Sequence, residues 1–359
     1  MRILQSDNGT LTSTYILNWL KGAREVYQVE IDYIGVWNER SSDATYVRTL
    51  KKTLADAGYP HVKIVAKDGG SDICQSMASD KEYAEAVDII GLHYPSDFSD
   101  YTTCHSLKKP FWASEESSSY DDINGAACWA RVVTSHYVEA RITSSIMWNL
   151  IGSYYHGTNW YASSMLTAVE PWSGHYSTQD EDLAVVYATA HVTQFTKVGW
   201  HYLPMGSGSG KLPGGGYYIT LVDPDTTDFT MNIVKIDESH APCTRPHLPA
   251  FNVSSEAVSF KLAPSMKATA SLAVWYSNFE VDPPIVFQKK PDIMPKDGVI
   301  TLDVEVGAFY TVCALASQSS VLFYWQTGSP RPAHPPLCAL SLSFCSFASF
   351  RFKIILTTL

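Results

Sequence analysis

The sequence predicts an α/β domain followed by an all-β domain. Up to about residue 195, five short apolar segments of strand length alternate with segments of helical periodicity, which is typical of a parallel α/β architecture. From about residue 196, glycine clusters and short alternating segments replace this pattern and indicate an antiparallel β-sandwich. A closed (β/α)8 barrel needs eight strands and about 250 residues, so the first part is either an open sheet or a barrel that the chain enters partway round.

The composition is that of a globular protein without a nucleic-acid partner. Of the 359 residues, 45% are hydrophobic and 17% are charged, so the chain can bury one large core or two medium ones. Its formal net charge is -10, and without a cationic surplus it cannot displace counterions from phosphates. The 10 Trp and 21 Tyr suit stacking against sugar faces, although core packing accounts for most of them.

A segment that ends in Asn38 and Glu39 provides the first predicted strand. Its apolar run, from Ile34 to Trp37, is typical of a buried strand. An amide and a carboxylic acid follow this run directly. Because barrel enzymes keep their catalytic groups at the carboxyl ends of the strands, we expect Glu39 to form one half of an active site.

The other elements of the α/β domain follow in regular alternation. Apolar runs predict the strands, and helical periodicity that stops at glycine or proline predicts the helices. The predicted helices lie at 14–33, 44–57, 71–86 and 125–141, and the further strands lie at 61–66, 87–92, 109–116 and 144–149.

The β-domain begins with two glycine clusters, at 206–210 and 214–216. Such clusters can cradle phosphates, but no Lys-Ser pair follows them at the start of a helix, so hairpin turns are favoured over nucleotide binding. The predicted strands of this domain lie at 217–222, 229–236, 257–262, 272–275, 299–304 and 308–313.

The seven cysteines do not form a metal-binding pattern. No CxxC pair or His-Cys cluster occurs, so a zinc site has little support, and the odd count leaves at least one thiol free. Two glycosylation sequons begin at Asn8 and Asn252 and indicate a secretory route. The residues after Met1 nevertheless contain no apolar stretch of signal-peptide length.

The carboxyl-terminal segment, 319–359, differs from both domains. Residues 320–359 contain no acidic residue and combine a proline-rich piece with apolar residues in no regular period. The apolar run at 337–350 is shorter than the roughly 20 residues needed to cross a bilayer, so we do not expect a transmembrane protein. We expect an unstructured, non-native tail.

A second acid, Glu115, ends the strand predicted at 109–116. Two carboxylates about 5 Å apart at the mouth of a barrel are what a retaining glycosidase needs, one as acid and base and one as nucleophile. Repulsion at that spacing raises one pKa, so that one group keeps its proton. A lone acid at a strand end is more often a solvated loop residue, but Glu39 and Glu115 come with suitable neighbours.

Those neighbours lie at the same strand ends. Asn38 can form a hydrogen bond with a sugar 2-hydroxyl, and the imidazole of His93 or the phenol of Tyr94 can orient the nucleophile. Trp148 offers a stacking wall. Glu116 follows Glu115 directly, and since side chains alternate along a strand, only one of these two acids should point into the mouth.

Several motifs together make a resemblance specific. The chain resembles glycoside hydrolase family 59 over about residues 10–315, through Ile-Gly-Val-Trp-Asn-Glu39, Trp-Ala-Ser-Glu115, Trp148-Asn-Leu150, Glu170-Pro-Trp-Ser-Gly-His-Tyr176 and Cys243-Thr-Arg-Pro246.

The resemblance implies a fold and a set of residue roles. The fold would be an incomplete TIM (β/α)8 barrel, about strands 4–8, at 1–195, followed by a β-sandwich domain at 196–318. Glu39 would be the acid/base and Glu115 the nucleophile. The family's sugar-pocket positions correspond to Asn38, His93, Trp148 and Arg245, and its disulfide between barrel and sandwich corresponds to Cys128 and Cys243. Glu116 takes the place of a family Asp.

The implied activity is retaining hydrolysis of the β-galactosyl bond of galactosylceramide and related galactolipids in the lysosome. The resemblance implies no cofactor and no metal, and a saposin-type lipid-presenting activator as partner. The family's chain starts well before this one and ends in a lectin domain, so we expect a truncated product with weak or no activity. The alternatives are a related enzyme for another β-glycoside, and a non-catalytic remnant that at most binds sugar or a partner.

Overall fold

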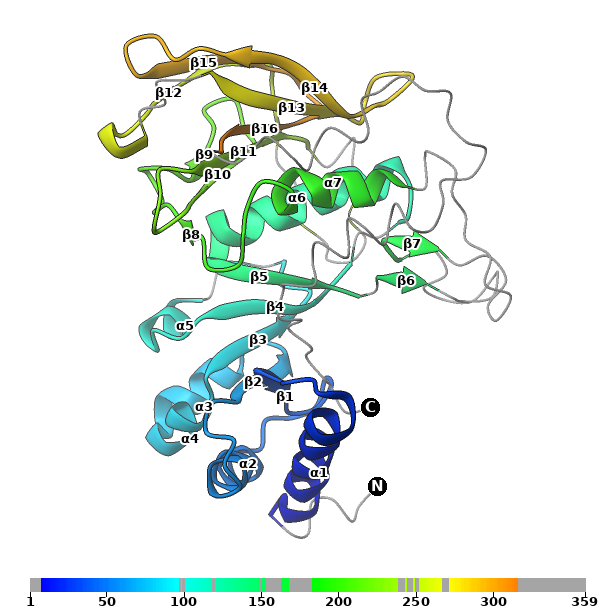
Figure 1. The fold of residues 1–359 in the computed structure, drawn as a ribbon, viewed down its shortest axis with the longest axis vertical. Coiled ribbons are helices and arrows are strands. Elements are labelled where there is room, and N and C mark those ends of the chain that lie inside the picture. The colour runs from blue at the N-terminus through cyan, green and yellow to red at the C-terminus, as the bar shows by residue number, and fades with distance from the viewer. Residues whose placement is uncertain are drawn as a thin grey trace.

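The structure is a computed structural model that describes residues 8–96, 98, 101–117, 120–148, 150–152, 163–167, 183–237, 243, 248, 252–266 and 271–315. A parallel sheet with its helices forms one end of the molecule, and an antiparallel sheet forms the other (Figure 1). The predicted tail at 319–359 lies outside the described residues.

Five strands form the parallel sheet in chain order. Their positions confirm the five predicted strand regions, and the sheet is parallel throughout. All five carboxyl ends therefore lie along one rim. The strands are β1 (Tyr33–Gly35), β2 (Lys63–Gly69), β3 (Ile89–His93), β4 (Phe111–Glu116) and β5 (Ile142–Met147).

Helices on the outside of this sheet share one apolar core with it. Buried residues such as Leu20, Leu50 and Ile64 come from helices and strands of the same cluster. The helices are α1 (Thr10–Tyr27), α2 (Ala44–Asp56), α3 (Ile73–Ser79), α4 (Lys81–Ala86) and α5 (Thr102–Ser106).

The single helix predicted at 71–86 is wrong. Asp80 ends α3 and begins α4, because its extended backbone breaks the helix and its side chain accepts a hydrogen bond of 2.9 Å from the Tyr83 N–H. Asp43 caps α2 in the same way through the Tyr46 N–H at 2.9 Å. Such caps stabilise a helix by about 1 kcal/mol each and fix where it starts after the preceding loop.

The antiparallel part confirms the predicted β-strands and adds others. Its seven-stranded sheet has the order β14-β13-β16-β11-β10-β8, with β9 beside β10, and β12 pairs with β15 in a separate ladder. The strands are β8 (His201–Tyr202), β9 (Gly210–Lys211), β10 (Tyr217–Val222), β11 (Phe229–Lys235), β12 (Glu256–Lys261), β13 (Leu272–Asn278), β14 (Ile285–Ile293), β15 (Val299–Val304) and β16 (Ala308–Ala314). A short parallel pair, β6 (Ile151–Gly152) and β7 (Leu166–Thr167), lies apart from both sheets.

The glycine cluster at 214–216 forms the hairpin turn that the sequence predicts. It connects β9 to β10, which are antiparallel, and Gly215 and Gly216 adopt left-handed φ angles of 79° and 90°. Lys235 is fully buried and its Nζ donates to the carbonyls of Gly214 and Gly215 at 3.0 and 2.7 Å. The turn is therefore tied to β11, and its polar groups are engaged by the protein itself.

Two helices fill the space between the sheets. In α6 (Ile123–Ala140), 14 of 18 residues are buried, as expected of a helix that is enclosed on all sides. α6 and α7 (Ala184–Thr193) share a core with Val234 and Phe309 of the antiparallel sheet. Figure 1 shows both helices between β5 and the antiparallel sheet. No helix among the described residues is both long enough and apolar enough to cross a membrane.

Two disulfides connect separate elements. Cys128 of α6 is bonded to Cys243, the pair that the resemblance implies. Cys74 of α3 is bonded to Cys104 of α5, a pair that the sequence did not reveal. Cys313 of β16 is buried.

The two disulfides should differ in their effect on stability. They close segments with sequence separations of 115 and 30 residues, and loop-closure entropy makes the longer bridge worth about 1 kcal/mol more. We expect Cys128→Ser to lower the free energy of unfolding more than Cys74→Ser does. Urea unfolding under oxidising conditions measures both, and a larger loss for Cys74→Ser would contradict the expectation.

Candidate active site

Side chains from the ends of four neighbouring strands meet at the carboxyl rim of the parallel sheet. They are Glu39, Asp68, His93 and Glu115, which follow or end β1, β2, β3 and β4 respectively. In the register of the sheet, His93 pairs directly with Glu115. Parallel neighbours thus deliver an imidazole and a carboxylate side by side.

Glu39 lies further from its strand than the sequence predicted. β1 ends at Gly35, so Glu39 belongs to the following loop, where its φ angle of 49° is left-handed. Its backbone N–H donates to the carbonyl oxygen of Asp68 at 2.9 Å, which anchors the loop over the end of β2. The Glu39 side chain is 49% exposed and is accessible to a substrate and to water.

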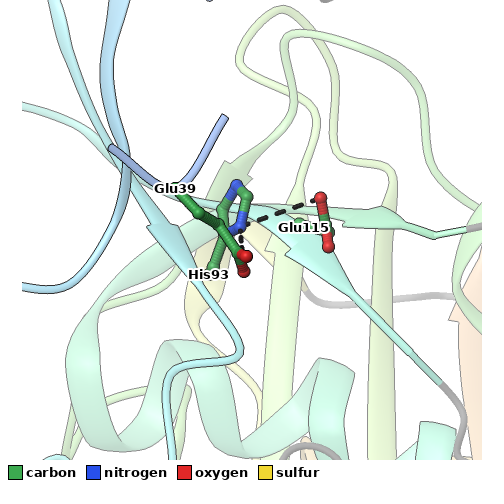
Figure 2. Close-up of side chains that lie close together, drawn as sticks. All are labelled: Glu39, His93 and Glu115. Carbon is green, nitrogen blue, oxygen red and sulfur yellow. Dashed lines mark hydrogen bonds and ion pairs between the residues drawn. The ribbon is translucent and has the colours of Figure 1, made fainter. Parts of the chain in front are cut away.

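One nitrogen of the His93 ring faces both candidate catalytic acids (Figure 2). Its Nδ1 is 3.2 Å from Glu39 Oε1 and 3.7 Å from Glu115 Oε2. One oxygen of each carboxylate and one ring nitrogen all lie within 4.8 Å of one another. Two carboxylates at about 5 Å match the spacing of retaining glycosidases, whereas inverting enzymes place them about 6.5–9.5 Å apart.

Tyr94 holds the second acid. Its hydroxyl donates to Glu115 Oε1 at 2.6 Å, and its backbone N–H donates to the Glu115 carbonyl at 3.0 Å. The Glu115 side chain is 18% exposed. Glu115 is therefore fixed in orientation and shielded more than Glu39.

Glu116 points to the opposite side of β4, as the alternation of side chains predicts. It is fully buried against α6, with Oε1 3.2 Å from His136 Nε2. Burial raises the pKa of Glu116 more than the adjacent His136 lowers it. His136 Nδ1 lies 2.8 Å from the Ser145 hydroxyl of β5. The buried His136 side chain therefore connects α6 to both β4 and β5.

Asp68 is a site residue that sequence reasoning missed. Its side chain is fully buried, with Oδ1 3.8 Å from His93 Nε2. The sequence showed it only as the start of Asp68-Gly-Gly70, which is typical of a turn. A charged residue next to the apolar strand core was the available signal, and by itself it does not distinguish a buried acid from a loop acid.

His93 is surrounded by negative charge. Its side chain is only 4% exposed, and burial alone would lower its pKa. The carboxylates of Asp68, Glu115 and Glu39 outweigh burial, so the pKa of His93 lies above its usual value. The ring therefore carries a proton over a wider pH range than a solvated histidine.

The other predicted site residues are placed only in part. Asn38 Oδ1 is buried and has no hydrogen-bond partner among the described residues. This amide oxygen is therefore available to accept a hydrogen bond from a ligand. Trp148 is partly exposed directly after β5, where its backbone N–H donates to the Glu116 carbonyl at 2.6 Å. Arg245 and the motif 170–176 lie outside the described residues.

An open pocket of about 450 Å³ lies beside the acids. Glu39, His93 and Tyr94 contribute to its wall from the site. Glu115 does not line it, so the pocket extends on the Glu39 side of the pair. Its lining is Glu39, Arg40, Ser41, Lys67, Gly69, Gly70, Asp72, His93 and Tyr94.

The trio of Glu39, His93 and Glu115 also offers two carboxylate oxygens and one imidazole nitrogen, a ligand set that zinc accepts. The sequence led us to expect no metal, and that expectation stays a prediction. The carboxylate spacing and the Tyr94 hydrogen bond suit acid and nucleophile roles without further assumptions.

Comparisons of the sequence with protein families and with related proteins agree on one family. The family model of glycosyl hydrolase family 59 matches residues 5–194, and the model of its central domain matches residues 202–319. The galactocerebrosidase of Danio rerio is 37% identical over 309 residues, which cover 86% of this chain and 46% of that protein. The galactocerebrosidase of Homo sapiens is 37% identical over 314 residues, covering 86% and 44%. The chain thus spans about half the length of these relatives.

Solved structures with the same fold are more distant in sequence. A GH30 endoxylanase from Clostridium papyrosolvens superimposes with a TM-score of 0.62 at 13% identity, covering 87% of this chain and 72% of that one. The catalytic domain of GH30 xylanase C from Talaromyces cellulolyticus gives a TM-score of 0.60 at 14% identity, covering 85% and 67%. These two likenesses concern the fold alone.

The raised pKa of His93 predicts a pH-dependent contribution to stability. A histidine whose folded pKa exceeds its unfolded value contributes stability that is present below pH 6.5 and is lost as pH rises through the folded pKa. We expect the stability difference between the wild type and His93→Gln to shrink as pH rises from 5.5 to 8.5. Urea unfolding at each pH measures it.

The exposed His61 provides the matched control. His61→Gln, measured over the same pH range, shows how much of a pH trend comes from removing any histidine, and the trend for His93→Gln is compared with it. A difference for His93→Gln that grows with pH would show that the carboxylates do not hold a proton on this ring.

Proposed function

The chain belongs to glycosyl hydrolase family 59, and we propose that it carries the catalytic acids of a retaining β-galactosidase for galactolipids such as galactosylceramide. The observation that carries this proposal is the pair Glu39 and Glu115, with an oxygen of each within 4.8 Å of the other. The name of the relatives, galactocerebrosidase, supports the substrate class.

We further propose that the parallel sheet corresponds to about strands 4–8 of a (β/α)8 barrel and occupies 1–195. The seven-stranded sheet and the β12-β15 ladder form a β-sandwich domain at 196–318. Support comes from the parallel order of the five strands and from a shared core in which residues of β12 and β15 pack against β11, β13 and β16. Residues 319–359 stand outside both domains.

In the first step, Glu115 attacks the anomeric carbon as a carboxylate and forms a galactosyl ester. The bond from that carbon to the ceramide oxygen breaks, and Glu39 gives its proton to this oxygen. The exposures of the two groups suit these roles, since Glu115 is shielded and held by Tyr94, while Glu39 borders the open pocket. The pocket on the Glu39 side is where the leaving alcohol departs.

In the second step, Glu39 acts as base. It takes a proton from water, the hydroxide oxygen attacks the anomeric carbon, and the ester bond to Glu115 breaks. Galactose leaves with the configuration that it had in the substrate, and both acids return to their starting protonation states.

Sugar binding is assigned to residues around the pair. We propose that Asn38 hydrogen-bonds to the 2-hydroxyl of the sugar, that Trp148 stacks on the sugar, and that His93 and Arg245 complete the pocket. A lysosomal location, glycosylation at Asn8 and Asn252, and a saposin-type activator belong to the same proposal. Both asparagines are exposed, as glycosylation requires.

The turnover of these 359 residues alone is proposed to be weaker than that of the relatives. β1 stands at one end of the strand order and pairs with β2 among the described strands, so its outer edge lacks a neighbour that would complete a pocket wall. A thermal shift with galactose, measured beside turnover of a fluorogenic β-galactoside, separates sugar binding from catalysis.

The carboxylate spacing predicts the stereochemistry of the product. We expect β-galactose to appear first when an aryl β-galactoside is hydrolysed, followed by slow mutarotation to the equilibrium mixture. Proton NMR of the anomeric signals during the first minutes measures this. Early accumulation of α-galactose would exclude the double-displacement mechanism.

The roles of the two acids can be separated with 2-deoxy-2-fluoro-β-galactosyl fluoride, whose leaving group needs no general acid. We expect the wild type and Glu39→Gln to gain the mass of one fluorosugar, because both retain the nucleophile. Glu115→Gln should gain none. Mass spectrometry of the intact protein is the measurement.

Glu116→Gln is the matched control, since Glu116 is the next residue and its buried carboxylate faces His136 of α6 and not the other catalytic acid. It should be labelled like the wild type. A labelled Glu115→Gln would assign the nucleophile to another residue, and an unlabelled wild type would contradict the proposed activity.

A further inference from the structure

Asp68 is a buried acid that the two-step reaction does not itself use. Neither of its side-chain oxygens has a hydrogen-bond partner among the described residues, although a buried carboxylate without compensation costs several kcal/mol. The charged neighbour at its oxygen is His93 Nε2, at 3.8 Å. Because burying the Asp68 carboxylate is costly, its position next to His93 Nε2 points to a role at this imidazole.

The strand beside Asp68 leaves room for this acid. Gly91 of β3 lies two residues before His93, and a Cβ at Gly91 would be 3.0 Å from Asp68 Oδ1 and 2.8 Å from Ser114 Oγ. A larger residue at 91 would push the carboxylate away. The acid is therefore packed against β3 on the Nε2 side of His93, while Glu39 and Glu115 face Nδ1.

We propose that Asp68 is a positioning residue that keeps His93 doubly protonated, so that one imidazolium serves as counter-ion to whichever of Glu39 and Glu115 is charged. This inference rests on the proposed retaining mechanism. Asp68 holds the proton on Nε2, and the second ring proton, on Nδ1, faces both catalytic acids.

The reaction itself calls for a counter-ion that serves two positions. Before the first step Glu39 is protonated and Glu115 is a carboxylate. After it Glu39 is a carboxylate and Glu115 is an uncharged ester. The pair thus carries one negative charge throughout, but this charge moves from Glu115 to Glu39. With Nδ1 3.7 Å from one acid and 3.2 Å from the other, a charged His93 need not move between the two states.

The groups around His93 favour the charged ring. Burial opposes it, and the carboxylates outweigh burial, which raises the pKa of His93. The titratable groups that face or adjoin the ring come from the β1 loop, β2, β3 and β4, and are Glu39, Asp68, Tyr94, Glu115 and Glu116.

The backbone of Asp68 contributes to the same geometry. Its carbonyl oxygen accepts the Glu39 N–H at 2.9 Å, in the stretch where Glu39 has a left-handed φ of 49°. One residue thus fixes both the acid/base loop, through its carbonyl, and the imidazole beside it, through its carboxylate. Asp68→Asn keeps the carbonyl and removes only the charge.

The test is the titration of His93 in the full chain, followed by NMR of labelled imidazoles and assigned by the signal that His93→Gln removes. We expect the His93 pKa to fall in Asp68→Asn, since burial is then less strongly opposed. The control is Asp88→Asn, which removes an acid paired with Lys51 Nζ at 2.6 Å just before β3, at the far end of the strand from His93. It should leave the His93 titration unchanged.

Two results would overturn the proposal. One is a folded Asp68→Asn protein whose His93 titrates as in the wild type. The other needs no variant: a wild-type His93 that titrates at or below about pH 6.5, the value of a solvated histidine. The second measurement keeps the proposal testable if Asp68→Asn does not fold.

Kinetics add a readout that a loss of folded protein would not change. In Asp68→Asn we expect both the rate of fluorosugar trapping and the rate of reactivation of the trapped enzyme to fall by about 10- to 100-fold, as for other groups that act through a catalytic partner. Reactivation is a rate per trapped molecule, so it is independent of the folded fraction. A fall in only one of the two rates would overturn the shared counter-ion.

The outcomes for Asp68 and for the proposed function remain distinguishable. A wild type that is never labelled by the fluorosugar, with a His93 titration that still depends on Asp68, contradicts the glycosidase and leaves the electrostatic coupling in place. A labelled wild type with a His93 titration that is indifferent to Asp68 contradicts the positioning role alone.

Discussion

The molecule is organised around an excess of negative charge that a parallel sheet concentrates on one rim. Two full charges within 4.8 Å of each other repel by at least about 3.5 kcal/mol at an effective dielectric constant of 20. One nitrogen of a single imidazole faces both of them, and a third carboxylate lies near the other ring nitrogen. This arrangement is stable only if one acid keeps a proton or the ring is charged, and an acid that holds its proton next to one that does not is what double displacement requires.

The rest of the fold keeps these groups at their distances. β3 and β4 place His93 and Glu115 in register, and Tyr94 adds a hydrogen bond from the same strand end. Behind β4, Glu116 and His136 form a buried pair that connects the strand to α6. Glu115 and Glu116 thus lie on opposite sides of β4. A displacement of β4 would disturb the contacts of both acids.

Much of the architecture could be predicted from apolar periodicity, and the exceptions have physical causes. β14 escaped prediction because it contains Pro291 and two lysines, yet it lies at the edge of its sheet, where a missing N–H is tolerated. The helix break at Asp80 depends on a side-chain cap that periodicity does not record. Both catalytic candidates were visible as acids at strand ends, whereas Asp68 was not, because its role depends on burial created by strands distant in sequence.

The helix α6 has a consequence for how the two matched family regions behave. One region ends near residue 194 and the other begins at 202, so the sequence suggests two modules. The buried residues of α6 nevertheless pack in one cluster with Val234 and Phe309 of the antiparallel sheet, and Cys128 of the same helix is bonded to Cys243. Separating the modules would expose a helix in which 14 of 18 residues are buried, so we expect the modules to unfold as a single cooperative unit. A chimera that takes one module from a relative therefore keeps its stability only if the residues of α6 at the contact match the module that packs against them.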